Sequence, residues 1–495
     1  MSSGHLTHTP HVLLSRKTEW VWLTVLLLGM TAIAGYCAPY LVGWIDEVQF
    51  ADPAYSLYLN QGFTSSAWPY QRPDEFFIGN APLFSFMLSM WMHIVGTDIV
   101  ALHAMNWGLA AIGVGLVWMA WVRVHPEIST FVRILIVFTL FTGYGMTFSY
   151  FSLRYDILGF ALLALVFYSS TLHGRLREYL LGVSGFLTIL AGFHLVVAVC
   201  IAIAGLVLLC RNTVKQWLSL FSGIVAGGMV WLAIVASQGL LKKFFLVTFG
   251  SQHVISGQLG QFVNQGDRGL LHKLQRPLQI YSEDPSLLIM MLCFVVGYVL
   301  IAKVPDALRA VSVSGRLFLI LTLLMPLGLF VIGKFPVYYT WLAFVPCCLL
   351  CGEIWDALIK ARGKVFALGL VAFCVVSVGV GTVSIVNTLL TKSSRADVLT
   401  SPEFKTQLRR DDWAYASFAA YFAIRPWVER VVVPTYGQTI FVPGIPEKDR
   451  ISVVLVSREE FAKTIAMLGG TWSQLPFGQP FTPRSQNWVL ARRVT

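Results

Sequence analysis

The sequence predicts a polytopic α-helical membrane protein with about eleven transmembrane helices, exterior juxtamembrane helices and a small C-terminal extracytoplasmic α/β domain. Hydrophobic residues make up 56% of the 495 residues and charged residues only 12%, about half the charged share of a soluble domain. Long apolar runs recur from residue 19 to residue 389, and Lys and Arg gather in the short loops between them. The net charge of +11 is therefore an orientation signal, and nucleic acid is not an expected partner.

The N-terminal part predicts a cytoplasmic tail, one span and a first exterior loop. Residues 1–18 are polar and end in Arg16 and Lys17, which favours the cytoplasmic side. The apolar run 19–42 is long enough to stay in the membrane as a span rather than be removed as a signal peptide. Residues 43–98 predict short helices in the headgroup region, because Trp, Tyr and Phe are frequent there.

The apolar run 179–210 predicts two short helices rather than one. A single helix of these 32 residues would be about 48 Å long, which exceeds the thickness of the hydrocarbon layer. Gly192, Phe193 and His194 interrupt the run near its middle. Basic loops at both ends require an even number of crossings, so we expect the two helices to meet at His194.

The remaining apolar runs predict single spans within a transmembrane domain that covers residues 19–389. These spans are residues 99–122, 128–151, 157–172, 216–237, 286–302, 317–332, 337–351 and 365–389. A second exterior loop lies at 238–285. An odd number of crossings puts residues 390–495 on the outer side, where short apolar runs bounded by Gly or Pro predict strands of an α/β domain. These runs are Val431–Val433, Ile451–Leu455 and Trp488–Leu490.

The cysteines predict packing rather than metal binding. Seven of the eight lie in or at apolar runs, where a thiol behaves as a small apolar side chain. Cys351 completes a group with Cys347 and Cys348, but no His is nearby to complete a metal site. A divalent metal is left open as a cofactor, with no ligands assigned.

Polar side chains gather on the predicted outer side, where the spans leave the bilayer. Asp46 and Glu47 follow the first span directly, and two adjacent carboxylates at a bilayer edge indicate catalysis or ligand binding. The alternative is a solvated helix end with Asp46 near the N-cap. Lys334 lies in a tight turn, which favours capture of a phosphate, although Lys can also extend to lipid headgroups.

Other outer residues also have a structural alternative to a functional role. Asp156 follows Arg154 between two apolar runs, so a local salt bridge is one alternative. Lys243 can cap the outer end of a span near anionic headgroups. His194 lies at the tip of a broken span, where backbone groups are exposed, and His253 can be a satisfied polar residue.

Four motifs occur in order over about residues 20–350, and together they resemble a known family. They are Asp46-Glu47-Val-Gln-Phe50-Ala51, the Ala81-Pro82-Leu83 start of an apolar segment, Arg154-Tyr155-Asp156, and Gly333-Lys334-Phe335-Pro336-Val337-Tyr338. This pattern resembles the integral-membrane GT-C glycosyltransferases that use polyprenyl-phosphate sugars, particularly protein O-mannosyltransferases and lipid A aminoarabinose transferases. The chain departs from that pattern at Gly79-Asn80, where Glu-Lys or His often stands, and at His103, where Arg is common.

The resemblance implies inverting transfer of a sugar from a polyprenyl-phosphate donor to a lipid, glycan or protein acceptor. The implied location is the bacterial inner (plasma) membrane, with the site facing the periplasm or exterior. Asp46 suits the base that takes the acceptor proton, and Asp156 is the second catalytic candidate. Basic residues suit the leaving lipid phosphate. The substrate-binding candidates are Glu47, Asn80, Arg154, His194, Lys243, His253, Arg268, Lys334, Tyr338 and Tyr339.

The main alternative function is a polytopic secondary transporter of a lipid or anionic solute. Such a protein would use intramembrane charges and broken helices near the midplane, and the break at His194 is one example. The sequence offers no matching second break, and its acidic residues lie on one face. A structural or assembly subunit is a third option, but it would leave the acidic motifs without a role.

Overall fold

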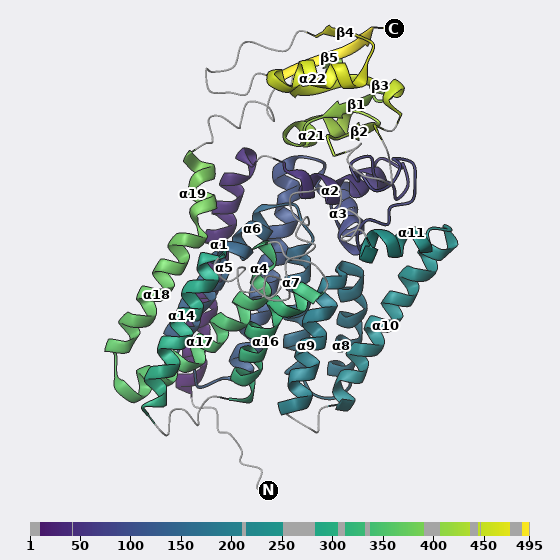
Figure 1. The fold of residues 1–495 in the computed structure, drawn as a ribbon. Helices are drawn as coiled ribbons and strands as arrows, with labels where there is room; N and C mark the ends of the chain where they lie inside the picture. Colours follow the sequence, from purple (N-terminus) through teal and green to yellow (C-terminus); the bar gives the residue numbers. More distant parts are fainter. Residues whose placement is uncertain are drawn as a thin grey trace, which may run out of the picture.

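The computed structural model describes residues 10–41, 43–209, 214–250, 283–304, 312–331, 337–390, 406–435, 444–445, 447–475 and 488–494 (Figure 1). A bundle of apolar helices forms the larger part of the molecule. A β-sheet with its helices lies at one end of the bundle, and the first helix begins at the opposite end. Three predicted site residues, His253, Arg268 and Lys334, lie outside the described residues.

The helices of the bundle follow the predicted apolar runs. They are α1 (Pro10–Cys37) with the 3-10 turn η1 (Ala38–Tyr40), α4 (Ile99–Val124), α5 (Thr130–Thr142), α6 (Tyr144–Phe151), α7 (Asp156–Ser170), α8 (Gly174–Ala191), α9 (Phe193–Leu209), α10 (Val214–Ser237), α14 (Pro285–Ala302), α16 (Val313–Val331), α17 (Trp341–Arg362), α18 (Val365–Gly381) and α19 (Val383–Leu390). Among the described residues, 5 helices are long and apolar enough to cross a membrane, or up to 6 if one bent pair counts as a span. The protein is an integral membrane protein, and the count of about eleven spans stays a prediction.

Two glycines break the apolar runs. The break predicted near His194 is confirmed, because α8 ends at Ala191 and α9 begins at Phe193, with Gly192 between them. The region predicted as a span over 128–151 consists of two helices, because α5 and α6 meet at a bend of 58°. Gly143 lies at this bend, where a Cβ would be 2.2 Å from the Phe344 ring, so close packing against α17 requires glycine there.

Helix α17 extends beyond its predicted end at residue 351. It continues to Arg362 although Glu353 and Asp356 lie in its last turns and are buried. Glu353 Oε1 lies 2.9 Å from His125 Nε2, and Asp356 Oδ2 lies 2.6 Å from Lys360 Nζ. These pairs compensate the buried carboxylates, so the helix does not have to end where the apolar run ends.

Short helices outside the bundle lie on the side of the sheet. They are α2 (Ile45–Tyr58), α3 (Leu83–Val95), α11 (Leu241–Phe245) with the π-helical turn η2 (Leu246–Gly250), and the 3-10 turn η3 (Val337–Tyr339). Figure 1 shows α2 and α3 between the bundle and the sheet. Helix α2 begins after Trp44, whose backbone N–H donates to Glu47 Oε2 at 3.4 Å and so fixes the first turn.

The C-terminal part contains a five-stranded mixed sheet. Its elements are β1 (Trp413–Ala416), α21 (Phe418–Ile424), η5 (Arg425–Trp427), β2 (Arg430–Val432), η6 (Lys448–Arg450), β3 (Ile451–Ser457), α22 (Arg458–Leu468), β4 (Thr471–Gln474) and β5 (Trp488–Val494). The strand order is β2-β1-β3-β5-β4, with β1 parallel to β2 and β3 and with β5 antiparallel to both its neighbours. The three predicted strands are confirmed, whereas the location of this unit outside the cytoplasm stays a prediction.

The two faces of the sheet bury different side chains. Tyr415 and Val454 pack with Phe461 and Leu468 of α22 on one face. The alternate residues, such as Ala414 and Leu455, belong to the same continuous core as the membrane helices and α21. Side chains alternate between the two faces along a strand. One face of the sheet therefore packs against α22, and the other packs against α21 and the membrane helices.

Candidate active site

Asp46 and Glu47 occupy the first turn of α2 but face different surroundings. The Glu47 side chain is 3% exposed, and its Oε1 accepts a hydrogen bond from Leu153 N at 2.6 Å and lies 3.2 Å from His103 Nε2. The Asp46 side chain is 22% exposed. These contacts favour a structural role for Glu47, which ties α2 to α4 and to the segment before α7. Of the two carboxylates, Asp46 is the one that is partly exposed.

Arg154 connects the two predicted catalytic carboxylates. Its Nη1 pairs with Asp46 Oδ2, and its Nε donates to Asp156 Oδ2 at 2.6 Å. The guanidinium also lies over the Tyr338 ring, 3.8 Å from its centroid, and within 5.1 Å of the Trp44 ring. Two carboxylates and aromatic faces therefore compensate the burial of an arginine that is 1% exposed.

Asn106 holds the segment that carries Arg154. Its Nδ2 donates to the carbonyl oxygens of Ser152, at 2.6 Å, and Arg154, at 3.0 Å. The sequence motifs do not include this residue. An amide inside the apolar run 99–122 is costly in a membrane, and that signal could have identified it. His103, noted only as a departure from the family pattern, proves to be the partner of Glu47.

The tyrosines of η3 join the site from the other side. Tyr338 Oη donates to Asp46 Oδ2 at 3.0 Å. The hydroxyl groups of Tyr339 and Tyr155 lie 2.5 Å apart, and the His194 ring centroid lies 4.6 Å from that of Tyr339. The structure thus brings Asp46, Arg154, Asp156 and Tyr338 into direct contact, with Tyr339 and His194 next to them.

Two predicted site residues lie outside this contact network. Lys243 Nζ pairs with Glu75 Oε2 of the first loop, and both side chains are about one quarter exposed, at 25% and 23%. Asn80 is half-buried and follows Gly79, where a Cβ would be 2.3 Å from the Trp68 indole. Within the described residues, no hydrogen bond or ion pair joins Lys243 or Asn80 to Asp46.

The arrangement of the chain has counterparts among solved structures. It is similar to ArnT from Cupriavidus metallidurans in the apo state, with a TM-score of 0.56 and 13% identity over 97% of this chain and 99% of that chain. The same protein bound to undecaprenyl phosphate gives a TM-score of 0.54 and 12% identity, covering 96% of this chain and 98% of that chain. This chain has the ArnT fold. The resemblance to GT-C membrane glycosyltransferases is therefore confirmed as a fold.

No family model matches the chain, and no curated protein matches it by sequence.

The carboxylates of this ArnT-fold site do not form a metal centre with each other. A guanidinium lies between Asp46 and Asp156, where a cation shared by the two carboxylates would have to bind. In the part of the chain that the structure describes, no group of three or more His, Cys, Asp or Glu residues could hold a metal ion. The described residues therefore assign no ligands to a divalent metal.

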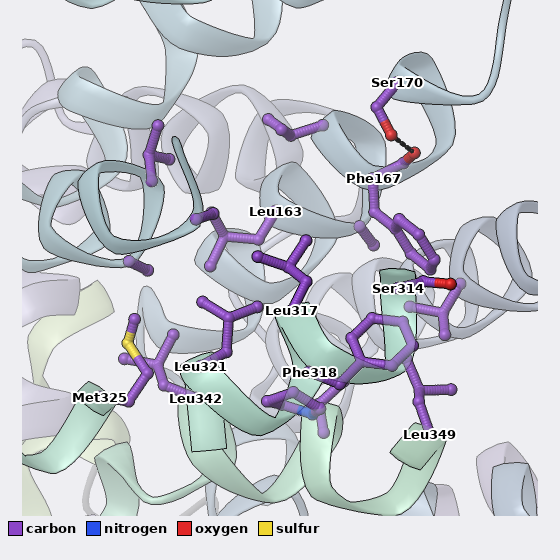
Figure 2. Close-up of a pocket in the computed structure, with 18 of the residues that line it drawn as sticks. Leu163, Phe167, Ser170, Ser314, Leu317, Phe318, Leu321, Met325, Leu342 and Leu349 are labelled. Atoms are coloured by element: carbon purple, nitrogen blue, oxygen red, sulfur yellow. Dashed lines mark hydrogen bonds between the residues drawn. The ribbon is translucent and has the colours of Figure 1, made fainter. Parts of the chain in front are cut away.

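An apolar cavity of about 440 Å³ lies inside the bundle of the ArnT fold (Figure 2). Its walls come from α4, α7, α9, α10, α16 and α17. Leu163, Leu317 and Leu321 lie around its centre, with Ser170 and Ser314 on one side and Met325 on the other. Trp341 belongs to the wall and follows Tyr339 by two residues, so part of the cavity wall is next to the candidate site along the chain. Such a cavity suits a hydrocarbon group rather than a polar ligand.

Proposed function

We propose that this protein is an inverting glycosyltransferase that uses a polyprenyl-phosphate sugar and a lipid, glycan or protein acceptor on the extracytoplasmic side. The observation that carries the proposal is the state of Asp46. Its carboxylate is half-buried at the edge of the bundle, and Arg154 and Tyr338 hold it in one orientation. Within the described residues both contacts use Oδ2, so Oδ1 is left to accept the proton of an acceptor group.

The reaction needs one proton acceptor and one stabilised leaving group. The acceptor oxygen bonds to the anomeric carbon while its proton passes to Asp46. The bond between that carbon and the phosphate oxygen breaks, and its electron pair leaves with the lipid phosphate. Attack from the face opposite the leaving group inverts the configuration of the anomeric carbon.

The remaining residues of the contact network hold Asp46 in position and set the net charge around it. Asp156 is 0% exposed and holds Arg154, so its role in the proposal is to orient the arginine. Arg154 pairs with both carboxylates, which leaves the three groups with one net negative charge. Tyr338 adds a hydrogen bond and shields one side of the guanidinium. Asp156→Asn should therefore lower activity less than a change at Asp46.

The donor proposal rests on chemistry and on the fold. An ArnT structure with this fold is bound to undecaprenyl phosphate, which supports a polyprenyl-phosphate donor here. The apolar cavity offers room for part of such a chain among membrane helices. Lys334 and Arg268 are proposed to bind the donor phosphate, because cations stabilise the growing charge of the leaving group. Asn80, Lys243 and His253 are proposed to contact the donor or the acceptor.

Transfer of label from a radiolabelled undecaprenyl-phosphate sugar to membrane lipid, glycan or protein tests the proposal. The full-length protein should transfer label in proteoliposomes, and Asp46→Asn should not, although it should still bind undecaprenyl phosphate. Asp74→Asn is the matched control, since Asp74 is an exposed carboxylate of the same loop. Undiminished transfer by Asp46→Asn would contradict the proposal. Movement of the intact labelled lipid across the bilayer, without cleavage, would support the transporter instead.

A further inference from the structure

Helix α21 of the C-terminal unit lies against α2, the helix that begins with Asp46. Phe418 and Phe422 contact the chain just before α2, where a Cβ on Gly43 would be 2.9 Å from the Phe418 carbonyl oxygen and 3.0 Å from the Phe422 ring. Tyr421 and Arg425 contact Asp52 in the middle of α2. Arg425 directly follows α21 as the first residue of η5, and its backbone still has right-handed helical angles. The members of each pair are four residues apart, so the two pairs follow neighbouring rows along this stretch.

The polar part of this contact excludes water. Asp52 and Arg425 are both 0% exposed, and Arg425 Nε donates to Asp52 Oδ1 at 2.8 Å. The Tyr421 hydroxyl donates to the same oxygen. Asp52 Oδ2 accepts from the backbone N–H groups of Ser66, at 2.5 Å, and Ala67, at 3.1 Å. The carboxylate therefore joins α21, α2 and the loop after α2.

The other N–H groups of Arg425 are also used. Its Nη2 donates to Ser56 Oγ at 3.1 Å and to Gln61 Oε1 at 3.0 Å, and its Nη1 donates to the Glu429 carbonyl at 3.2 Å. Gln61 Nε2 donates to the same carbonyl at 2.7 Å. Arg430 adds a hydrogen bond to Thr64 Oγ1 at 2.7 Å. Loss of the Arg425 fork would leave a buried carboxylate without its counter-charge, and α21 could not keep this position.

We infer that Arg425 is a positioning residue for Asp46, and that the C-terminal unit sets the orientation of the catalytic carboxylate. Asp46 and Asp52 are separated by six residues, which is about 9 Å along a helix and about 240° around it. Asp46 accordingly faces Arg154 and Tyr338, while Asp52 faces Tyr421 of α21 and Arg425. Helix α2 is fixed between the two, and a displacement of about 1 Å at a reacting group can lower a rate about a hundredfold. This inference rests on the proposed function.

The test compares Arg425→Gln and Arg425→Lys with the wild type, using the purified full-length protein. Hydrogen exchange measures the protection of the α2 amides, and transfer kinetics give kcat. Titration with undecaprenyl phosphate gives a Kd. Arg425→Gln should expose the α2 amides and lower kcat about a hundredfold. The Kd should change less than twofold, because the contacts of Arg425 among the described residues are with α2, the loop after it and its own unit. Arg425→Lys keeps the charge but not the fork and should recover part of both losses.

Arg492→Gln and two glycine variants separate positioning from general destabilisation. Arg492 forms a two-pronged pair with Asp412 inside the C-terminal unit, at 2.8 Å for each contact, and its hydrogen bonds within the described part of the chain do not reach α2. Arg492→Gln should leave α2 protection and kcat unchanged. Gly43→Ala should lower kcat by pushing Phe418 and Phe422 away. Gly29→Ala should not, because nothing lies within 4 Å of a Cβ there. Should Arg425→Gln fail to fold, the two glycine variants still decide the question.

The possible outcomes distinguish the positioning role of Arg425 from the proposed function. Normal α2 protection and kcat in Arg425→Gln would overturn the inference, and so would equal losses in Arg425→Gln and Arg492→Gln. A wild type that transfers no label would overturn the proposed function alone, because hydrogen exchange still reports whether Arg425 holds α2. Faster exchange at α2 with a selective loss of kcat would support both.

Discussion

Helix α2 carries two carboxylates that each pair with an arginine, yet their surroundings differ. Asp52 accepts six hydrogen bonds through both oxygens, and neither it nor Arg425 is exposed. Among the described residues Asp46 accepts two, both through Oδ2, and it is 22% exposed. A carboxylate with all its hydrogen-bond sites occupied can only hold structure. One with a free oxygen at an opening is available to take a proton.

The two arginines also differ in their partners. Arg425 donates its N–H groups to the Asp52 carboxylate, to neutral side chains and to carbonyl oxygens. The charge of Asp52 therefore neutralises that of Arg425 within the interface. Arg154 is shared by two carboxylates and covered by aromatic rings, so its position is fixed while a net negative charge is left at the site. The first arrangement joins two parts of the protein. In the proposed function, the second holds Asp46 ready to act as a base.

Asp46→Asn should have the largest effect on activity. A general base typically contributes a factor of about 10² to 10⁴, and asparagine cannot accept the proton. The free energy of unfolding should change little, because the amide oxygen can still accept from Tyr338. Steady-state transfer and thermal unfolding of the full-length protein check both expectations. A large fall in the free energy of unfolding of Asp46→Asn would mean that Asp46, like Asp52, mainly holds structure.

Asp52→Asn should have the largest effect on stability. Removing one partner of a buried ion pair typically costs about 3 to 5 kcal/mol, because the remaining charge is left unpaired in a dry interface. Unfolding of the full-length protein in denaturant, followed by tryptophan fluorescence, measures the change. Asp74→Asn, at an exposed site in the same loop, should have no measurable effect. Equal stability of Asp52→Asn and wild type would mean that α21 does not depend on this pair.

The sequence could predict the half-exposed carboxylate but not the buried one. Asp46, Arg154 and Tyr338 are unusual where they stand, because charged groups at a bilayer edge need a partner or a function. Arg425 is 373 residues from Asp52 along the chain, and nothing near either residue indicates the other. The pair exists only because the C-terminal unit docks on α2, which is a tertiary event.

Local geometry limits sequence prediction in a similar way elsewhere. Adjacent residues of a helix project about 100° apart, so the sequence could not tell which of Asp46 and Glu47 is exposed. Gly143, at the bend between α5 and α6, packs against the Phe344 ring of α17, which lies far along the chain. Asn106 could have been found, since a polar residue inside an apolar run carries its own signal.

Lys334→Ala should have an intermediate effect, on donor binding only. A desolvated contact between Lys and phosphate contributes about 1.5 to 3 kcal/mol, so the Kd for undecaprenyl phosphate should rise about ten- to a hundredfold. Lys334→Arg should recover part of the loss, because the charge matters more than the shape. Lys448→Ala is the control, since Lys448 is an exposed lysine of η6. An unchanged Kd in Lys334→Ala would indicate that Lys334 contacts lipid headgroups instead of the donor phosphate.

The smallest expected effect is the pH dependence that Asp52 contributes to the stability of the protein. Burial by itself would raise the pKa of Asp52, but the charge of Arg425 and the hydrogen bonds from Tyr421 and Arg425 hold it below its usual range. An unfolded Asp titrates near pH 4, so the pair contributes its full stability above about that pH. The contribution is lost as the pH falls through the lower folded value, at about 1.4 kcal/mol for each unit by which the pKa is lowered. Unfolding curves of the full-length protein between about pH 7 and pH 3 should show this loss in the wild type and in Asp46→Asn. Asp52→Asn should lose less stability over this range, because one titrating group is gone while Asp412, whose pKa the hydrogen bond from Arg492 holds low, remains. The same fall in all three proteins would assign the pH dependence to the other carboxylates.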